Sequence, residues 1–253
     1  MDKTDKQMIL LMVAVLIVVV FLGFIVNTFL APTFKGTPIT NSTINNAVSK
    51  LDSKNHYLAK FSTSVGDFTV SLDTKSAPNY TSIFATNANN NYYDGSKFYG
   101  YDQGMGVLLG RNQNGETQGN LFDEFNSSSL NLQNDKVSSI FDQLKSHKDN
   151  LYKDSDVDSN MNMSLKDFNE KFLGVKYSTH VTSSKIQKYS LIASVLGNTG
   201  TTEMIITTTN TNRYLDGRRL HIGDVISGTE IIDKIIASPV NSVTIKSVQV
   251  NKQ

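Results

Sequence analysis

The chain has 253 residues, 39% of them hydrophobic, which is enough for one large domain or two small ones with a buried core. Its net charge of +1 provides no field that would attract nucleic acid, so no nucleic-acid partner is expected. It contains no cysteine, which excludes disulfides, thiolate nucleophiles and thiolate metal sites. The four histidines, His56, His147, His180 and His221, show no metal-ligand spacing, so neither a metal nor a cofactor is expected.

A long apolar run without a single charge follows a short polar tail, residues 1–7. The run extends from Met8 to Val26, and about 20 apolar residues at roughly 1.5 Å rise per residue can cross a bilayer. A cleaved signal peptide is the alternative, but its apolar core would be about 7–15 residues long and would end in small residues. The sequence therefore predicts a transmembrane anchor over residues 8–30. Lys3 and Lys6 predict a cytoplasmic amino end, which makes this a single-pass protein of the cell membrane with an extracellular C-terminal domain.

Residues 31–56 are rich in Pro, Gly, Ser, Thr and Asn and are predicted to be a linker. Strand patterns begin immediately afterwards. Apolar residues alternate loosely over residues 57–63 and strictly over residues 67–72, with Gly66 between the two segments. This pattern predicts a β-hairpin.

A helix is predicted after the hairpin, with Ser76 as its N-cap and Pro78 in its first turn. Residues 92–125 then form the stretch around which the domain is organised, and it opens with an Asp94-Gly95 turn between aromatic residues. Residues 126–187 are polar and charged and contain two weakly amphipathic pieces. We expect this segment to be a helical insertion that lies outside the rest of the domain.

An acidic run in the insertion raises the question of a calcium site. Asp154, Asp156 and Asp158 have the spacing of the first ligands of an EF-hand loop. The sixth position is Ser159 instead of Gly, and the twelfth is Leu165 instead of Glu. Starting the loop at Asp156 supplies an acid at the last position but puts a methionine at the turn. The sequence therefore predicts a solvated acidic loop and no metal site.

Strand patterns return in the C-terminal third of the chain. They cover residues 190–195, 204–209, 220–226 and 243–250, and a helix is predicted over residues 230–237. The domain is therefore expected to be mainly β, with a helix near each end of the sequence that forms the sheet.

Five short pieces of the chain occur in a characteristic order. They are Gly66-Asp67-Phe68-Thr69-Val70-Ser71-Leu72; Ala77-Pro78 followed by Phe84; Tyr93-Asp94-Gly95-x-x-Phe98; Gly119-x-x-Phe122 leading to Glu124-Phe125; and Leu215-Asp216-Gly217-Arg218 followed by Gly223-x-Val225-Ile226-Ser227-Gly228. Their order and spacing resemble those of the cyclophilin family of peptidyl-prolyl cis–trans isomerases. The resemblance covers about residues 57–125 and 189–250.

The resemblance implies a closed antiparallel barrel of eight strands with a helix over each end. The cyclophilin-like domain would then occupy residues 57–250, interrupted by the insertion at residues 126–187. Its partners would be proline-containing peptide segments or unfolded proteins, and no cofactor is implied.

The resemblance also implies an active site, and the chain departs from it. The position of the family's catalytic arginine is Gly100, and the position of its substrate-binding glutamine is Leu108. Arg219 falls at a position that borders the groove and is the candidate substitute for the missing arginine. The positions that would line the substrate groove are Met105, Leu108, Ala193, Ile205, Tyr214, Leu215 and Arg219.

Catalysis of prolyl isomerisation requires a group that the chain lacks at that position. The barrier to rotation about an X-Pro bond is about 18–20 kcal/mol because the C–N bond has partial double-bond character. The family lowers this barrier with an apolar pocket for the ring and an arginine that donates to the prolyl nitrogen. Loss of a well-placed donor typically removes about 2.7–4 kcal/mol of transition-state stabilisation.

Two functions remain open at this point. The first is a membrane-anchored, extracellular isomerase of the cyclophilin type that assists protein folding, with activity weak or lost. The second is a non-catalytic module that binds a peptide or a protein through the old groove or through residues 126–187. The family's fold alone does not decide between them.

Overall fold

The computed structural model divides into two compact units, Met1–Phe34 and Lys35–Gln253. The residues described below all lie in the second unit; they are 50–112, 114–115, 124–147, 152–193, 202–210 and 213–253. The anchor predicted over residues 8–30 and the tail over residues 1–7 lie outside this set. Within the described ranges, no helix is both long enough and apolar enough to cross a membrane.

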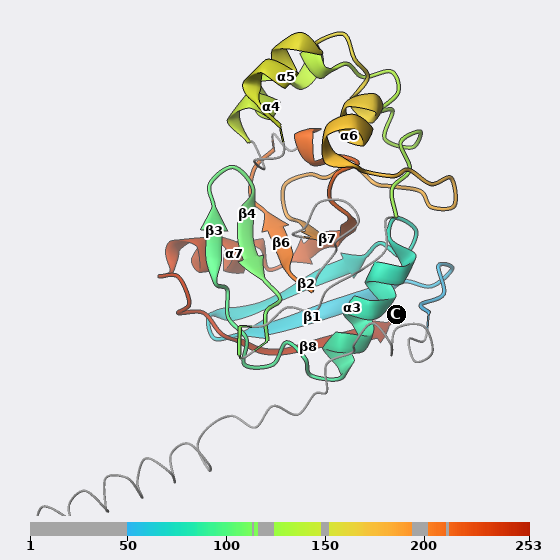
Figure 1. Ribbon diagram of the computed structural model, residues 1–253. Helices are drawn as coiled ribbons and strands as arrows, with labels where there is room; N and C mark the ends of the chain where they lie inside the picture. The colour runs from blue at the N-terminus through green and yellow to red at the C-terminus, as the bar shows by residue number, and fades with distance from the viewer. Residues whose placement is uncertain (1–49, 113, 116–123, 148–151, 194–201, 211–212) are drawn as a thin grey trace, which may run out of the picture. The chain divides into compact units, whose positions relative to one another are not determined.

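Eight antiparallel strands form a single curled sheet (Figure 1). The strands are β1 (Tyr57–Thr63), β2 (Gly66–Leu72), β3 (Gly100–Asp102), β4 (Gly106–Leu109), β5 (Ser190–Ala193), β6 (Met204–Thr207), β7 (His221–Ser227) and β8 (Ile245–Lys252). Their order across the sheet is β3-β4-β6-β5-β7-β2-β1-β8. The predicted mainly-β architecture with eight antiparallel strands is therefore confirmed.

The prediction of a closed barrel is not supported, because the sheet ends at β3 on one side and at β8 on the other. The segments that lead into these strands meet at one isolated bridge, Lys97 to Thr244, and Phe98 N donates to Val243 O. Immediately after that bridge the backbone turns toward β4, where Tyr99 N donates to Leu108 O. Pairing with β4 therefore replaces a continuous β3–β8 ladder.

The exposed edge of β8 is covered by one side chain of the first helix. That helix, α3 (Pro78–Asn89), packs against β8. Asn89 Nδ2 donates to Val250 O at 3.1 Å, and Val250 N donates to Asn89 Oδ1 at 2.9 Å. The amide thus takes the place of a neighbouring strand, which protects the edge from pairing with another chain.

The amino end of α3 is held from a distant part of the chain. Ser76 was predicted as its N-cap, and this is wrong: the N-cap is Ala77, whose side chain cannot accept a hydrogen bond. The Glu124 carboxylate instead accepts from Asn79 N and Tyr80 N, each at 2.9 Å. Burial raises the pKa of Glu124. A long-range carboxylate therefore satisfies the free N–H groups of this helix.

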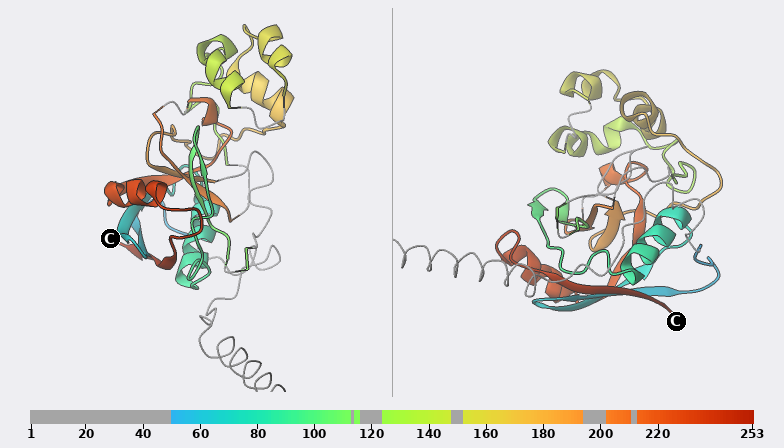
Figure 2. Two further views of the ribbon diagram at one scale, coloured as in Figure 1. Left: turned by 90° about the vertical axis from the view of Figure 1, so that its left-hand side faces the viewer. Right: turned by 60° about the horizontal axis from the view of Figure 1, so that its bottom comes forward.

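The interior of the curled sheet is filled by aromatic and branched side chains. Phe61 stacks on Phe68 with ring centroids 4.5 Å apart, and on Phe84 of α3 at 6.1 Å. The second helix, α7 (Thr229–Ala237), packs against β2 and contributes Ile232 to the same core. α3 and α7 lie at different ends of the curled sheet (Figure 2). These side chains belong to one buried hydrophobic cluster inside the curled sheet, which we call the interior core.

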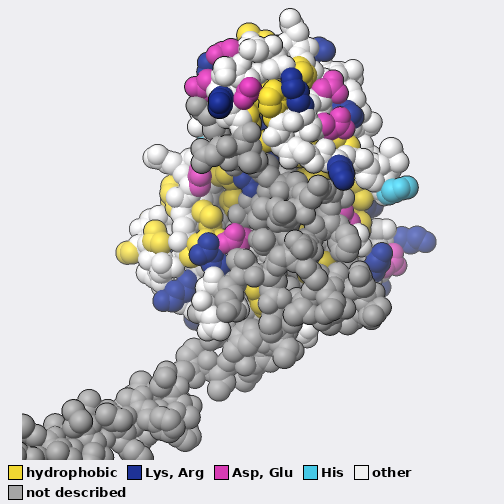
Figure 3. Space-filling view, viewed as in Figure 1, with side chains coloured by type: hydrophobic (Ala, Val, Ile, Leu, Met, Phe, Trp, Pro, Cys, Tyr) yellow, Lys and Arg dark blue, Asp and Glu magenta, His cyan; other side chains and the backbone are white. Residues whose placement is uncertain are grey.

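The segment predicted as a helical insertion forms a small helical cap beyond one end of the sheet (Figure 1). Its helices are η2 (Val137–Ile140), α4 (Phe141–Ser146), α5 (Asp154–Ser159) and α6 (Leu165–Leu173). An isolated bridge between Lys136 and Ser164 joins its two halves. On the face shown in Figure 3, acidic and basic side chains are mixed over this cap, so it presents no large field of one sign.

The acidic run in the insertion is a helix rather than the predicted loop. Asp154 and Asp156 lie in the first turn of α5, where carboxylates interact favourably with the helix dipole. Asp156 also accepts from Lys153 N at 2.7 Å, and Asp158 pairs with Lys145 at 2.9 Å. Among the residues that the structure describes, no group of three or more His, Asp or Glu side chains could hold a metal ion.

Candidate functional site

Four side-chain positions form a row across one face of the sheet. Gly100 of β3 lies opposite Leu108 of β4, Leu108 lies opposite Ile205 of β6, and Ile205 lies opposite Ile192 of β5. Because side chains alternate along a strand, residues paired in this way point to the same side of the sheet. The row thus brings together Gly100 and Leu108, at which the resemblance implies polar residues, and the apolar residue Ile205.

The other side of these strands belongs to the interior core. Val107, Leu109, Met204 and Ala193 are all part of that core. Ala193 was predicted to line the groove, but its side chain lies in the interior, and its neighbour Ile192 takes the place in the row. A one-residue difference in register exchanges the two faces of a strand, and a resemblance between short motifs does not detect it.

The row belongs to a second apolar cluster, which we call the outer cluster. It includes the predicted groove residues Met105, Ile205, Tyr214 and Leu215, and Leu108 packs against it partly buried. It also includes apolar side chains of the insertion, namely Leu130, Leu132, Val137, Ile140, Leu144, Tyr152, Val157, Leu165 and Phe168. The predicted groove floor and the insertion therefore share one continuous buried core.

Helix α4 makes the contact at the centre of the outer cluster. Tyr214 lies in the short helix η3 (Arg213–Leu215). Tyr214 N donates to Gln143 Oε1 at 3.2 Å, and the ring of His147 stacks on the ring of Tyr214 with centroids 4.5 Å apart. Tyr214 is consequently buried, although the resemblance would make it an exposed wall of the groove.

Two arginines fasten the insertion to the segment that carries Tyr214. Arg213 forms an ion pair with Asp135 and also pairs with Asp216. Arg218 is fully buried, donates from Nε to Asn169 Oδ1 at 2.8 Å, and lies 5.6 Å above the ring of Tyr152. These contacts hold the insertion in place beside the sheet.

The chain contains four arginines, of which Arg219 is the predicted substitute for the family's catalytic arginine. Arg213 and Arg218 are engaged with the insertion, as described above. Arg111 pairs with Glu203 at 2.6 Å, and its guanidinium lies 4.2 Å above the ring of Tyr99. Arg219 is only 7% exposed, so its side chain is not presented to solvent.

The backbone at Gly100 would accept a larger residue. A Cβ atom built there would meet Leu108 Cδ1 at 3.4 Å, which is ordinary van der Waals contact. Glycine is therefore not required at this position by backbone conformation or by space.

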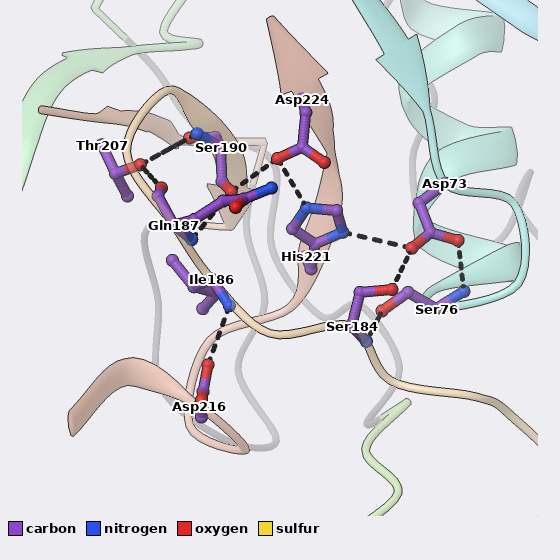
Figure 4. A network of polar contacts seen from close by, with 10 residues as sticks. All are labelled: Asp73, Ser76, Ser184, Ile186, Gln187, Ser190, Thr207, Asp216, His221 and Asp224. Carbon is purple, nitrogen blue, oxygen red and sulfur yellow. Dashed lines mark hydrogen bonds and ion pairs between the residues drawn. The ribbon is translucent and has the colours of Figure 1, made fainter. Parts of the chain in front are cut away.

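A separate polar network surrounds His221 of β7 (Figure 4). His221 Nδ1 lies 3.2 Å from Asp73 Oδ2, and Nε2 lies 3.1 Å from Asp224 Oδ1. Ser184 donates to Asp73 at 2.5 Å, and Ser190 donates to Asp224 at 2.7 Å. The network joins β2, β5, β7 and the chain that returns from the insertion. It opens onto a cavity of about 590 Å³.

Electrostatics keep the His221 ring positively charged. Burial lowers the pKa of His221, but the two carboxylates outweigh it and raise the pKa to about 9. Burial raises the pKa of Asp73, yet His221 and Ser184 outweigh it and lower the pKa to about 2. Since both ring nitrogens donate to carboxylates, neither can accept a proton from a serine. The network is therefore a structural clamp and not a hydrolytic triad.

The sequence alone shows no ligand spacing around His221 and predicts no role for it beyond that of an ordinary strand or surface residue. The spacing of His221 and Asp224, three residues apart, offered a weak local signal. The partnership with Asp73 spans 148 residues and offered none. Only the fold brings these groups together.

Comparison with known proteins defines the class of this fold and site. A family model described as cyclophilin type peptidyl-prolyl cis-trans isomerase/CLD matches residues 58–252. Because this match spans more than half of the chain, the chain belongs to the cyclophilin family. Its fold supports a function of the folding-isomerase type.

Individual relatives are distant. The chain has no match among the curated proteins. It is similar to two crystal structures of a cyclophilin-type peptidyl-prolyl cis-trans isomerase from Cryptosporidium parvum, one of them determined in the presence of the dipeptide Ala-Pro. In both comparisons the sequence identity is 14% and the TM-score is 0.47, with 78% of this chain and 99% of that chain covered.

Proposed function

We propose that the protein is a membrane-anchored, extracellular member of the cyclophilin family that acts on proline-containing segments of proteins, with isomerase activity weak or lost. Membership in the family supports the substrate class. The apolar run from Met8 to Val26 supports the anchor, and Lys3 and Lys6 support a cytoplasmic amino end.

One observation carries the weak or absent activity: Gly100 stands in β3 where the family has its arginine, opposite Leu108. Neither side chain can donate a hydrogen bond to a prolyl nitrogen or hold a substrate amide. A missing donor of this kind lowers rates by about 100- to 1000-fold. The alternative donor, Arg219, is buried.

A second function is favoured by the outer cluster. Since the predicted groove floor is buried against the insertion, the protein is also a candidate for a non-catalytic module that binds proteins through the solvent-facing side of its insertion. Such a module would keep the cyclophilin sheet as a rigid support and would need no catalytic donor.

A prolyl isomerase assay on the full-length protein in detergent micelles tests the proposal. The rate with an Ala-Pro peptide is expected to lie within about tenfold of the uncatalysed rate and to be unchanged by Arg219→Ala. A rate typical of an efficient enzyme, about 10⁴ M⁻¹s⁻¹ or more in kcat/KM, would contradict it. If that rate then fell in Arg219→Ala, the substitute donor would be identified.

A further inference from the structure

The groove residues and the insertion share a buried core, to which helix α4 contributes the side chain of Leu144. Most of the insertion is fastened by the buried side chain of Arg218 and the ion pair of Arg213. Helix α4, by contrast, has only six residues, and it reaches Tyr214 through one hydrogen bond from Tyr214 N to Gln143 and one ring stack from His147.

The carboxyl end of α4 packs against the β3–β4 turn through the ring of His147 and leaves a space beside that contact. A cavity of about 430 Å³ lies between them, lined by Ser146 and His147 on one side and by residues 101–105 on the other. Met105, a predicted groove residue, forms part of this lining. An interface that leaves such a space gives up dispersion contacts on both sides of it, so it opens more readily than a close-packed one.

The ring of His147 also lies directly over the backbone of Gly104. A Cβ atom built at Gly104 would stand 2.1 Å from His147 Cδ2 and 2.2 Å from Nε2. The ring can occupy this position only because residue 104 has no side chain. Gly104 and Tyr214 therefore hold the ring from two sides, and Tyr214 OH donates to Gly104 O at 3.3 Å.

We propose that α4 together with His147 is an intramolecular cover over the apolar groove, and that a prolyl peptide enters only when this cover moves away. The proposal rests on the proposed function in taking the row of Gly100, Leu108 and Ile205 as the old substrate groove. The Arg218-fastened part of the insertion stays in place, and α4 opens by giving up the burial of Leu144 and the hydrogen bond from Tyr152 OH to Leu144 O.

The cover can be tested by thiol labelling, because the chain contains no cysteine of its own. A single cysteine at Ile205, which is 2% exposed, reports on the groove, and one at Tyr101, which is 43% exposed, reports the rate for a freely accessible site. A third reporter at Ala193, in the interior core, detects global unfolding. All three are made in the full-length protein in detergent micelles and reacted with a maleimide.

Two independent substitutions are designed to displace the cover. His147→Ala removes the ring stack, and Gly104→Ala adds a methyl group that pushes the ring off Tyr214. Asp142→Ala changes an exposed residue on the same helix and serves as the matched control. We expect the Ile205→Cys reporter to label at least tenfold faster with either opening substitution than with Asp142→Ala or with no further change.

Two results would overturn the proposal. Labelling of the Ile205→Cys reporter as fast as that of Tyr101→Cys in the otherwise unchanged protein would show that no cover exists. Equal, slow labelling in all backgrounds would show that α4 is not the part that opens. If Ala193→Cys becomes reactive in one opening variant, that variant has unfolded and the other decides. Because labelling does not depend on catalysis, the outcome is independent of the isomerase assay.

Discussion

Gly100 lies directly opposite Leu108 in the β3–β4 ladder, on the side of the sheet that the insertion covers. The proposed function and the proposed cover together make two conditions for catalysis absent at this pair: a donor for the prolyl nitrogen and open access to the groove. The two are separable by mutation, because the donor would depend on residue 100 and access on α4.

The double variant Gly100→Arg/Gly104→Ala is expected to gain prolyl isomerase activity. Arginine restores the donor, worth about 100-fold or more, and the added methyl group displaces His147. Gly100→Arg alone should gain much less, since the groove remains covered. The measurement is kcat/KM for an Ala-Pro peptide. Gly100→Leu/Gly104→Ala, which adds bulk without a donor, is the control, and equal rates in the two double variants would refute the idea.

The His221 clamp predicts a loss of stability in alkaline solution. The pKa of His221 is raised from 6.5 to about 9 in the folded protein, so the clamp contributes fully below pH 6.5 and is lost as the pH rises through about 9. The clamp contributes on the order of 3 kcal/mol to the free energy of unfolding, at about 1.4 kcal/mol for each unit of pKa difference between the folded and unfolded states. Urea unfolding between pH 6 and pH 10 measures it.

His221→Gln isolates this contribution from the other groups that titrate in the same range. The variant should be less stable than the native protein at pH 6, and the difference should shrink toward pH 10. A difference that stays constant over this range would mean that the ring is not charged in the folded state.

In the acid range, the relevant group is Asp73. Its pKa is lowered from 3.8 to about 2 in the folded protein, so the stability that its charge gives the fold is present above pH 3.8 and is lost as the pH falls through about 2.

Arg218→Met should weaken the attachment of the insertion. Methionine provides an unbranched side chain to fill the space but cannot donate to Asn169. The buried amide oxygen of Asn169 is therefore left without this hydrogen bond. A loss of about 1.5–3 kcal/mol in the free energy of unfolding is expected. Lys166→Met breaks a half-exposed pair with Glu170 and should cost less than about 0.5 kcal/mol. Equal costs in urea unfolding would show that Arg218 is not a fastening residue.

Topology is open to a direct test on cells. Protease added to intact cells is expected to degrade the unit Lys35–Gln253, because the anchor proposed over residues 8–30 would leave it outside. A cytoplasmic protein in the same sample serves as the control for leakage. Degradation only after lysis would contradict an extracellular domain, and loss of the protein from the membrane fraction after deletion of residues 8–30 would support the anchor.

Local patterns in the amino-acid sequence were enough to predict the secondary-structure elements and the family. Strict alternation over residues 67–72 with Gly66 before it predicts a hairpin, and the structure has it as β1 and β2. Such patterns can be read without a structure because their period depends on residues two to four positions apart. The same holds for Gly100 and Leu108, whose identities in the sequence are the basis for proposing that two polar roles of the family are vacant.

The surroundings of these residues depend on how distant parts of the chain pack together. It placed Ala193 inside and Ile192 outside, capped α3 with Glu124 instead of Ser76, and joined His221 to Asp73 across 148 residues. It also buried the groove floor under the insertion. These outcomes depend on packing and on buried charges seeking partners far along the chain, and no local pattern encodes which distant partner is found.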